Sequence, residues 1–459
     1  MLKDASAHEV RPPKLVRESA WETYDNQPWL KKDKKKVTVL YNYVERWKSY
    51  FLRAYLDRKG YRYVDMGDHV KEDLTFGKEY GNRMECNPMY FTSGCLIRNL
   101  MKIHEEQGLS KEEIVKNYVF LGGGGQCGPC RYGMYPQEYL KVVNEAGFKG
   151  FRILIFSSDL ADAGLPKGSA VKFNLEFRIN MLLAIVLADL MHVSECALRP
   201  RAVDKEQLFN AMAEAEKILF DAFRSSLYLF KLPSALKKAG KVLASVPRRN
   251  GELPLIFVTG EFFANLAHND GNYNLRRFIS DEGCEVIPGL MTQRILYDNW
   301  RREQEALRGM KFAEDETERK TWKRSLRKQR NSTGIIKWFA KKYIEAMDLE
   351  SFGAKMHLLD LDELAELGAE HYHPHIFGGE GNLEIAEAIH FAGKIDGFIS
   401  AKPFGCMPSS GVSDGVQAKI MGMYPGYNFL SIETSGDNDV SILSRVSMLL
   451  FKAKQKRTV

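Results

Sequence analysis

Residues 117–132 read NYVFLGGGGQCGPCRY, and this stretch decides how the first part of the chain folds. A short apolar run at 118–121 ends in four glycines, which predicts a buried strand followed by a tight loop. Glycine has no side chain, so the backbone N–H groups of this loop can approach an anion closely. The loop then presents Cys127 and Cys130. Two thiolates in this setting suit a metal ion, an iron–sulfur cluster or redox exchange.

Apolar runs and helical patterns alternate on both sides of this strand, and the same alternation returns in the second half of the chain. Further strands are predicted at 37–43, 61–67, 151–156, 253–261, 396–401 and 427–433. Strands separated by helices are typical of parallel sheets. We therefore expect an α/β fold with two Rossmann-like, doubly wound parallel-sheet domains, a helical connector and a helical insertion.

The predicted domain organisation follows from this pattern. Residues 1–36 are polar and are predicted to form an N-terminal extension. Domain I spans 37–200 and carries Cys86, Cys95, Cys127 and Cys130, while 201–250 form the helical connector. Domain II spans 251–459, carries Cys406, and contains a charged helical insertion at about 302–345.

Composition narrows the class of protein. The chain has 459 residues, 44% hydrophobic and 27% charged, as expected of a globular protein with more than one domain. A net charge of +7 is small for this length, and the basic run 319–330 is offset by acidic residues just before it, so nucleic acid is not favoured as a partner. We found neither a signal peptide nor an apolar run of the ~20 residues that span a bilayer. We expect a cytoplasmic protein without a membrane segment, whose cysteines are reduced.

Five of the seven cysteines fall in predicted loops or at helix starts. Cys95 is predicted to begin a helix over 94–107, and Cys406 follows the strand at 396–401. Because the carboxyl ends of parallel strands face a common crevice, two facing domains could surround one point with four cysteines: Cys86, Cys127, Cys130 and Cys406. The other two, Cys196 and Cys284, adjoin apolar segments and are predicted to be buried core residues.

Three chemistries compete for these thiols. In thioredoxin-like exchange the second cysteine already lies in the helix, whereas here RYGMY separates Cys130 from the helix start at Pro136. A zinc site usually takes two CxxC pairs, and the chain has one. An iron–sulfur cluster takes thiolates from distant loops. Gly124 and Gly125 could then offer N–H groups to the cluster, and Arg131 could offset its charge. The residues favour the cluster and leave zinc and exchange open.

A second glycine-rich turn, at 378–382, is predicted to open a helix. Glu380 and His375 lie near that helix start and are candidate catalytic residues for proton handling. The alternation of His371, His373 and His375 resembles metal-ligand spacing, but no carboxylate pattern completes a site, so a solvated or capping role is favoured.

Four strings occur in order along the chain: ECNPMYFTSG at 85–94, GGGGQCGPCRYGMY at 122–135, HIFGGEGNLEIAEAI at 375–389 and AKPFGCMPS at 401–409. Together they resemble the 2-hydroxyacyl-CoA dehydratase and benzoyl-CoA reductase family, most of all the dehydratase-like part of large activase-related proteins, among them double-cubane cluster protein relatives. The similarity runs over about 37–455. It implies a cluster between two domains, with Cys86, Cys130 and Cys406 as thiolate ligands.

The resemblance also implies a cofactor and partners. The cofactor would be a 4Fe–4S cluster, with a double-cubane 8Fe–9S cluster as a variant. Cys127 departs from the family pattern and would supply a fourth thiolate ligand, at the iron that dehydratases leave open to substrate or water. Cys95 is a second cysteine outside the family pattern. The implied partner is an ATPase activase with its own 4Fe–4S cluster, alongside a related α/β subunit in the complex or a second copy in a homodimer. No P-loop motif occurs in this chain, which fits an electron acceptor.

The expected function is that of an iron–sulfur protein that accepts low-potential electrons from the activase. It would then reduce a small substrate or relay electrons in a larger complex. The alternatives are an (R)-2-hydroxyacyl-CoA dehydratase subunit using a ketyl radical, and a non-catalytic scaffold or maturation factor for clusters. The basic segment 319–342 is a candidate docking surface.

Overall fold

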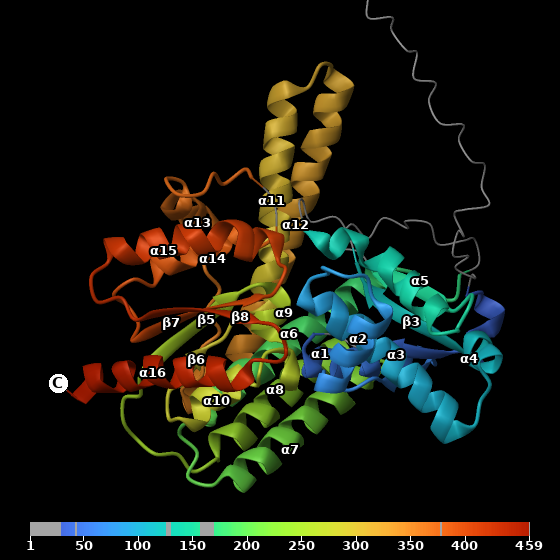
Figure 1. Ribbon diagram of the computed structural model, residues 1–459, viewed down its shortest axis with the longest axis horizontal. Coiled ribbons are helices and arrows are strands. Elements are labelled where there is room, and N and C mark those ends of the chain that lie inside the picture. The colour runs from blue at the N-terminus through green and yellow to red at the C-terminus, as the bar shows by residue number, and fades with distance from the viewer. Residues whose placement is uncertain (1–28, 42–43, 125–129, 157–168, 377–378, 459) are drawn as a thin grey trace, which may run out of the picture.

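The computed structural model describes residues 29–41, 44–124, 130–156, 169–376 and 379–458. Within these residues the chain forms two four-stranded sheets, with strand orders β2-β1-β3-β4 and β6-β5-β7-β8 (Figure 1). Strand pairing is parallel throughout both sheets. The predicted α/β fold with two doubly wound parallel sheets is therefore confirmed.

The first sheet contains β1 (Thr38–Tyr41), β2 (Arg62–Asp65), β3 (Tyr118–Gly123) and β4 (Arg152–Phe156). Its helices are α1 (Arg46–Arg58), α2 (Lys71–Tyr80), α3 (Asn87–Gln107), α4 (Lys111–Asn117) and α5 (Tyr135–Glu145). The strand β3 runs two glycines further than predicted. A Cβ atom on Gly123 would lie 2.6 Å from the hydroxyl of Tyr132, so the glycine lets the 3-10 helix η2 (Arg131–Met134) fold back against the strand end.

The second sheet contains β5 (Leu255–Gly260), β6 (Glu285–Ile287), β7 (Gly397–Pro403) and β8 (Phe429–Thr434). Its helices are α9 (Phe262–Leu266), α10 (Leu275–Asp281), α13 (Leu361–Gly368), α14 (Gly381–His390), α15 (Asp414–Met423) and α16 (Asp439–Thr458). In both sheets the winding direction changes between the two central strands, β1 and β3 in one and β5 and β7 in the other. Ligands of such sheets bind at the carboxyl ends of the strands beside this change.

Three helices join the two sheets: α6 (Leu175–Leu198), α7 (Lys205–Arg224) and α8 (Tyr228–Ala244). The helix α6 is long and apolar enough to cross a membrane, but 94% of its most apolar window is buried inside the protein. Its residues join the largest hydrophobic core, so in this fold α6 is a core helix.

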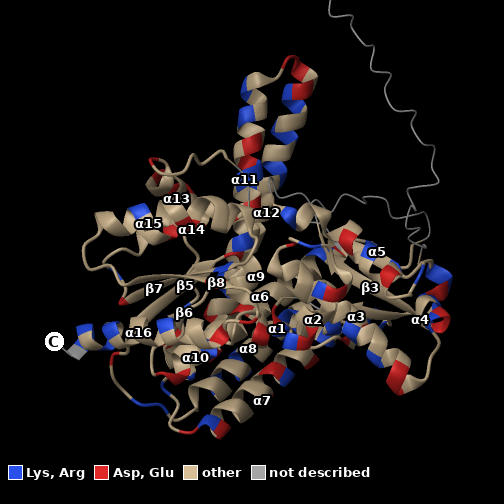
Figure 2. Ribbon diagram, viewed as in Figure 1, with Lys and Arg blue, Asp and Glu red and all other residues tan. Residues whose placement is uncertain are grey.

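The predicted insertion is a helical hairpin of α11 (Met291–Phe312) and α12 (Glu316–Met347). The two helices lie side by side, and their far ends project from the body (Figure 1). Lys, Arg, Asp and Glu residues are interspersed along this projecting part (Figure 2). The hairpin therefore exposes a mixed charged surface.

One helix boundary was predicted wrongly. The helix α3 begins at Asn87 instead of residue 94, so Cys86 is its N-cap and Cys95 lies inside it. Pro88 fits the first turn, where its missing N–H is not needed. Gly94 is not a helix start but a contact point, because a Cβ atom there would lie 1.7 Å from the carbonyl oxygen of Asp73 on α2.

Candidate cysteine site between the two sheets

Cys86 and Cys406 come from different domains and meet at the junction of the two sheets. The backbone N–H of Asn87 donates to the carbonyl oxygen of Phe404 at 3.0 Å. A Cβ atom on Gly405 would lie 3.3 Å from the Cα atom of Cys86. The two cysteines thus flank one backbone contact, and both are buried.

Cys130 approaches the same place from the carboxyl end of β3. It is the N-cap of η2, and its sulfur accepts a hydrogen bond from the N–H of Tyr132 at 3.5 Å. The next residue, Arg131, donates to the carbonyl of Met84, two residues before Cys86. The hydroxyl of Tyr135 lies 3.2 Å from the sulfur of Cys86. The structure therefore brings three of the predicted ligands, Cys86, Cys130 and Cys406, to one junction.

The remaining residues of this loop divide into two groups. Cys127 and Gly125 lie outside the described residues. Gly124 is buried, and a Cβ atom there would lie 2.9 Å from the ring of Pro136, so this glycine lets the loop cross the start of α5. The Nε atom of Arg131 is buried and has no hydrogen-bond partner in the described part of the chain. This donor is thus available to an anionic group.

The thiols of Cys86 and Cys406 are poor nucleophiles in this environment. Burial raises the pKa of Cys86 to about 11, against a smaller opposing effect of the hydrogen bond with Tyr135. Burial raises the pKa of Cys406 further, and the charge of Glu261 adds to it. Thiol–disulfide exchange needs a lowered thiol pKa, so Cys86 and Cys406 themselves are not suited to it. A metal centre, in contrast, displaces the thiol protons when it binds.

A glutamate that the sequence reasoning missed, Glu261, stands at the carboxyl end of β5. It is the N-cap of α9 and accepts hydrogen bonds from the N–H groups of Phe263 and Ala264 at 2.8 and 3.1 Å. Burial of its carboxyl group, followed by the charge of Glu380, raises its pKa to about 8. Glu261 is therefore largely protonated at neutral pH. Its position directly after a strand, at the change of winding, was the signal that could have revealed it.

Two further buried glutamates lie on α14. Glu384 accepts hydrogen bonds from the hydroxyls of Ser409 and Ser413, just beyond Cys406. Glu387 accepts one from the hydroxyl of Thr259 on β5, and burial raises its pKa to about 8. These residues extend an acidic group from Glu261 along α14.

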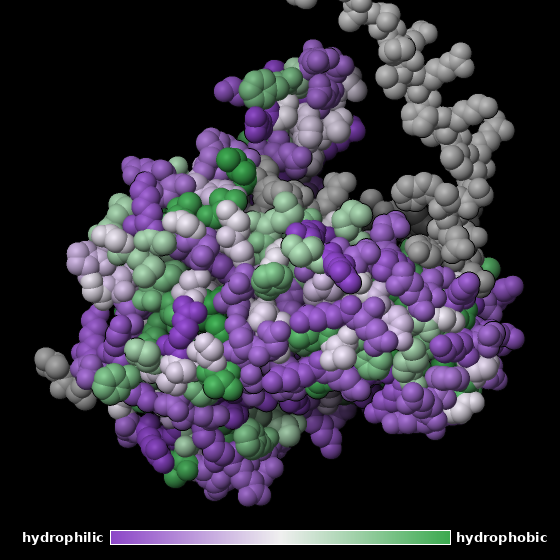
Figure 3. Space-filling view, in the orientation of Figure 1, coloured by the Kyte–Doolittle hydropathy of each residue, from purple (hydrophilic) through white to green (hydrophobic). Residues whose placement is uncertain are grey.

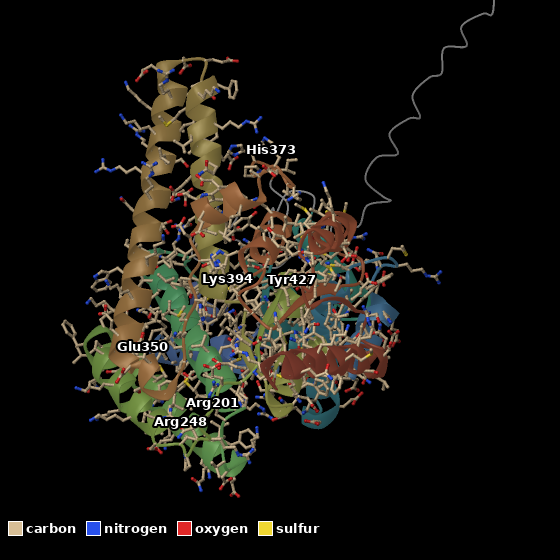
Figure 4. The ribbon with its side chains drawn as sticks, turned by 90° about the vertical axis from the view of Figure 1, so that its left-hand side faces the viewer. Arg201, Arg248, Glu350, His373, Lys394 and Tyr427 are labelled. Atoms are coloured by element: carbon tan, nitrogen blue, oxygen red, sulfur yellow. The ribbon has the colours of Figure 1, made fainter. Side chains whose placement is uncertain are left out.

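Glu380 belongs to this group, and His375 does not. Glu380 is buried at the start of α14 and is ion-paired with Arg294 on α11. His375 is partly exposed, and its backbone N–H donates to the Nδ1 atom of His373 at 3.2 Å. Figure 4 shows His373 at an outer edge of the body, near the helical hairpin. Burial, His373 and Arg308 lower the pKa of His375, so its ring is neutral at pH 7.

Cys95 is placed away from Cys86. Nine residues of α3 separate them, or about 13 Å along the helix axis. Cys95 lies instead with His69 and Asp73. Cys196 and Cys284 are buried, as predicted, in the core of the second domain.

Exposed apolar side chains flank each of the three converging cysteines. Met84, Met134, Phe404 and Met407 are 72%, 61%, 47% and 48% exposed. Each lies within four residues of Cys86, Cys130 or Cys406 in the sequence. On the face in Figure 3 apolar residues are scattered among hydrophilic ones. We call these four residues the apolar rim.

Comparison with models of known protein families and with curated proteins finds no match. The family resemblance thus remains an interpretation of the four strings, and the function rests on the geometry.

Proposed function

We propose that Cys86, Cys130 and Cys406 bind an iron–sulfur cluster of the 4Fe–4S type between the two domains. The observation that carries this proposal is the hydrogen bond from Asn87 to Phe404, which joins two cysteine loops from separate sheets. Such a cluster accepts and donates single electrons at a potential set by burial and hydrogen bonding.

The donor set fits a cluster better than a single zinc ion. Among the described residues, the sulfur atoms of Cys86, Cys130 and Cys406 do not all lie within 4.8 Å of one another. Each thiolate of a cluster binds a different iron, so these sulfurs stand further apart than the ligands of one ion. The buried Nε atom of Arg131, which has no hydrogen-bond partner among the residues that the structure describes, supports an anionic group at the site. A double-cubane cluster would need more thiolates than these three.

The protonated carboxyl group of Glu261 supports reduction of a small substrate at this site. In its ionised form Glu261 would raise the pKa of both Cys86 and Cys406, which supports a place for its carboxyl group in the same region as the two thiols. With a pKa of about 8, Glu261 holds a proton at neutral pH that a reduced substrate can take up. We assign proton handling to Glu261, with Glu380 raising its pKa.

The apolar rim supports docking of a protein electron donor. Exposed apolar residues that gather on a surface mark interaction sites, and those of the rim are close in sequence to the cysteines through which electrons would enter. The proposed donor is a cytoplasmic ATPase activase with its own 4Fe–4S cluster. Electron transfer to a site that is mostly buried requires such close docking.

The test is anaerobic purification with assays of iron and sulfide, and electron paramagnetic resonance with and without the activase and ATP. We expect a brown protein whose iron and sulfide disappear in Cys86→Ser and Cys406→Ser. The variant Cys284→Ser, at a buried cysteine elsewhere, should keep both. A colourless protein that binds zinc through Cys86 and Cys406 would overturn the proposal. If Cys127→Ser keeps the cluster and gains or retains dehydratase activity, the dehydratase alternative replaces electron transfer.

A further inference from the structure

A second group of metal-ligand side chains lies inside domain I. The ligand atoms of His69, Asp73 and Cys95 all lie within 4.8 Å of one another. The three side chains are 2%, 0% and 0% exposed. His69 comes from the segment before α2, Asp73 from the first turn of α2, and Cys95 from the middle of α3. We propose that they form a closed structural site for one zinc ion.

Close packing of α2 against α3 creates this group. A Cβ atom on Gly94 would lie 1.7 Å from the carbonyl oxygen of Asp73, and one on Gly77 would lie 1.9 Å from that of Tyr90. Only glycine fits at either position, so the two helix backbones touch there. Because Cys95 follows Gly94 directly, this contact places its sulfur next to Asp73.

The imidazole of His69 points to a missing ligand. Both of its ring nitrogens are buried and have no hydrogen-bond partner in the parts of the chain that the structure describes. The nearest acceptor is the Oδ2 atom of Asp73, at 3.5 Å from Nδ1. Buried polar atoms are nearly always paired, with protein, water or an ion. A zinc ion held between His69, Asp73 and Cys95 would satisfy one of these nitrogens.

Arg98 contacts the other two proposed ligands, Asp73 and Cys95. Arg98 donates from Nε to the Oδ1 atom of Asp73 at 2.5 Å, which leaves Oδ2 facing His69. Arg98 also brings its guanidinium to 3.8 Å from the sulfur of Cys95, so a positive charge lies beside a ligand that binds zinc as a thiolate. The carbonyl oxygen of Met66 lies 4.0 Å from the same sulfur and can supply a fourth donor.

The donor types select zinc. A thiolate, an imidazole and a carboxylate are the three kinds of protein ligand that zinc takes, usually four in a tetrahedral arrangement. Calcium and magnesium prefer oxygen ligands alone, so the thiolate excludes them. The burial of all three side chains leaves no open position for substrate, which is typical of structural zinc sites.

The site lies where domain I meets domain II. The ring of His69 packs against Phe263 of α9 at 5.1 Å between centroids. The carbonyl of His69 accepts a hydrogen bond from the N–H of Asp270, whose carboxylate in turn accepts one from the N–H of Lys71. An ion here would fix α3 against α2 beside this contact. Because Cys86 is the N-cap of α3, the zinc site would support the cysteine site without sharing its ligands.

The experiment measures zinc binding by the full-length chain after treatment with a chelator, with Zn²⁺ or Co²⁺ added alone. We expect one equivalent of zinc, a thiolate-to-cobalt absorption band with Co²⁺, and a zinc-dependent rise in unfolding temperature. All three should be lost in Cys95→Ser and His69→Leu and kept in the control Cys284→Ser. Without metal, His69→Leu should be at least as stable as the parent chain, because it removes two unpartnered nitrogens. A His69→Leu chain that is less stable without metal, or equal zinc binding in all variants, would overturn the site.

Failure of this proposal can be separated from failure of the cluster. Cys86→Ser and Cys406→Ser should lose iron and sulfide and keep the zinc. If those two variants lose zinc while His69→Leu and Cys95→Ser keep it, zinc belongs to the interdomain cysteines, and both proposals fail. If Cys86→Ser and Cys406→Ser lose iron and sulfide as expected, but His69→Leu still binds zinc like the parent chain, only the zinc proposal fails.

Discussion

The two groups of candidate ligands differ in how they are assembled. The interdomain cysteines come from three loops of two domains, and exposed apolar side chains flank them. The His69 group comes from the packed helices α2 and α3 and the segment just before α2, and its side chains are buried. A spread, partly accessible set suits a cluster that exchanges electrons with a partner, whereas a compact, closed set suits a single structural ion. In the two proposals, Cys86 at the N-cap of α3 and Cys95 inside α3 therefore belong to different sites.

The largest effect on stability is expected from Gly94→Val, which disrupts the contact between α2 and α3 beside the His69 group. The new side chain would collide with the backbone of Asp73, so α2 and α3 must separate. Overpacking of this kind costs about 3 kcal/mol or more, and zinc binding should be lost with it. Urea unfolding and zinc titration measure both effects.

The control is a substitution of another helical glycine, Gly334→Ala, which is expected to stabilise the chain. Gly334 lies inside α12, and a Cβ atom there would meet nothing within 4 Å. Alanine is a better helix former than glycine by about 1 kcal/mol, so Gly334→Ala should stabilise the chain and leave zinc binding unchanged. Equal destabilisation by Gly94→Val and Gly334→Ala would contradict the close contact of α2 with α3.

A buried acid of the interdomain region, Glu387, should make the stability of the fold depend on pH. Burial raises its pKa from 4.5 to about 8. Between pH 4.5 and about 8 the folded chain holds a proton on Glu387 that the unfolded chain has released. The free energy of unfolding therefore falls as pH rises through this range, by a few kcal/mol for this group.

The variant Glu387→Gln should reduce the decrease of the free energy of unfolding with pH, because the glutamine side chain does not titrate. Urea unfolding midpoints at several pH values measure it. Glu105→Gln, at an exposed position on α3, is the control and should leave the slope as it is. An unchanged slope in Glu387→Gln would show that the carboxyl group of Glu387 is not held protonated in the fold.

Gly405→Ala tests the spread site with a smaller change. Gly405 has φ +77°, and a Cβ atom would lie 3.2 Å from the carbonyl oxygen of Glu85. A left-handed conformation costs an alanine about 1–2 kcal/mol. The variant should lose iron and sulfide while it still binds zinc. Loss of zinc with retention of iron would reverse the assignment of the two sites.

The smallest effect on stability is expected at the apolar rim. Met84→Ser and Phe404→Ser replace exposed side chains, so unfolding should change by no more than about 0.5 kcal/mol. The rate of electron transfer from the activase should fall several-fold, because docking buries these residues in the proposed complex. Phe230→Ser is the control, since Phe230 is 83% exposed on α8, outside the rim. Equal rates in rim and control variants would place the docking surface elsewhere.

The sequence predicted the fold well because fully buried parallel strands are apolar runs bounded by glycine and proline. The runs before Gly122 and before Cys406 became β3 and β7. It also predicted that Cys86, Cys127, Cys130 and Cys406 surround one point, since strand ends of facing sheets share a crevice. The described contacts place Cys86 beside the loops of Cys130 and Cys406, and Cys127 lies outside the described residues. Cys95 was misplaced because Gly94 was interpreted as a helix boundary, whereas it allows a close helix contact.

The acidic group and the His69 group escaped prediction for a different reason. Glu261, Glu384 and Glu387 are ordinary residues in the sequence, and only packing shows that they share one region. His69 is 26 residues from Cys95, and no spacing rule joins a loop histidine to a cysteine in the middle of a helix. Such contacts depend on how closely two helices approach, which the glycines determine only once the partner helix is known.

The measurement that tests the central claim most directly is the content of iron, sulfide and zinc in the anaerobically purified chain and in Cys406→Ser, side by side. The parent chain should contain about four iron and four sulfide, together with about one zinc. Cys406→Ser should lose the iron and sulfide and keep the zinc. A parent chain without iron, or a variant that loses zinc and keeps iron, would contradict the account.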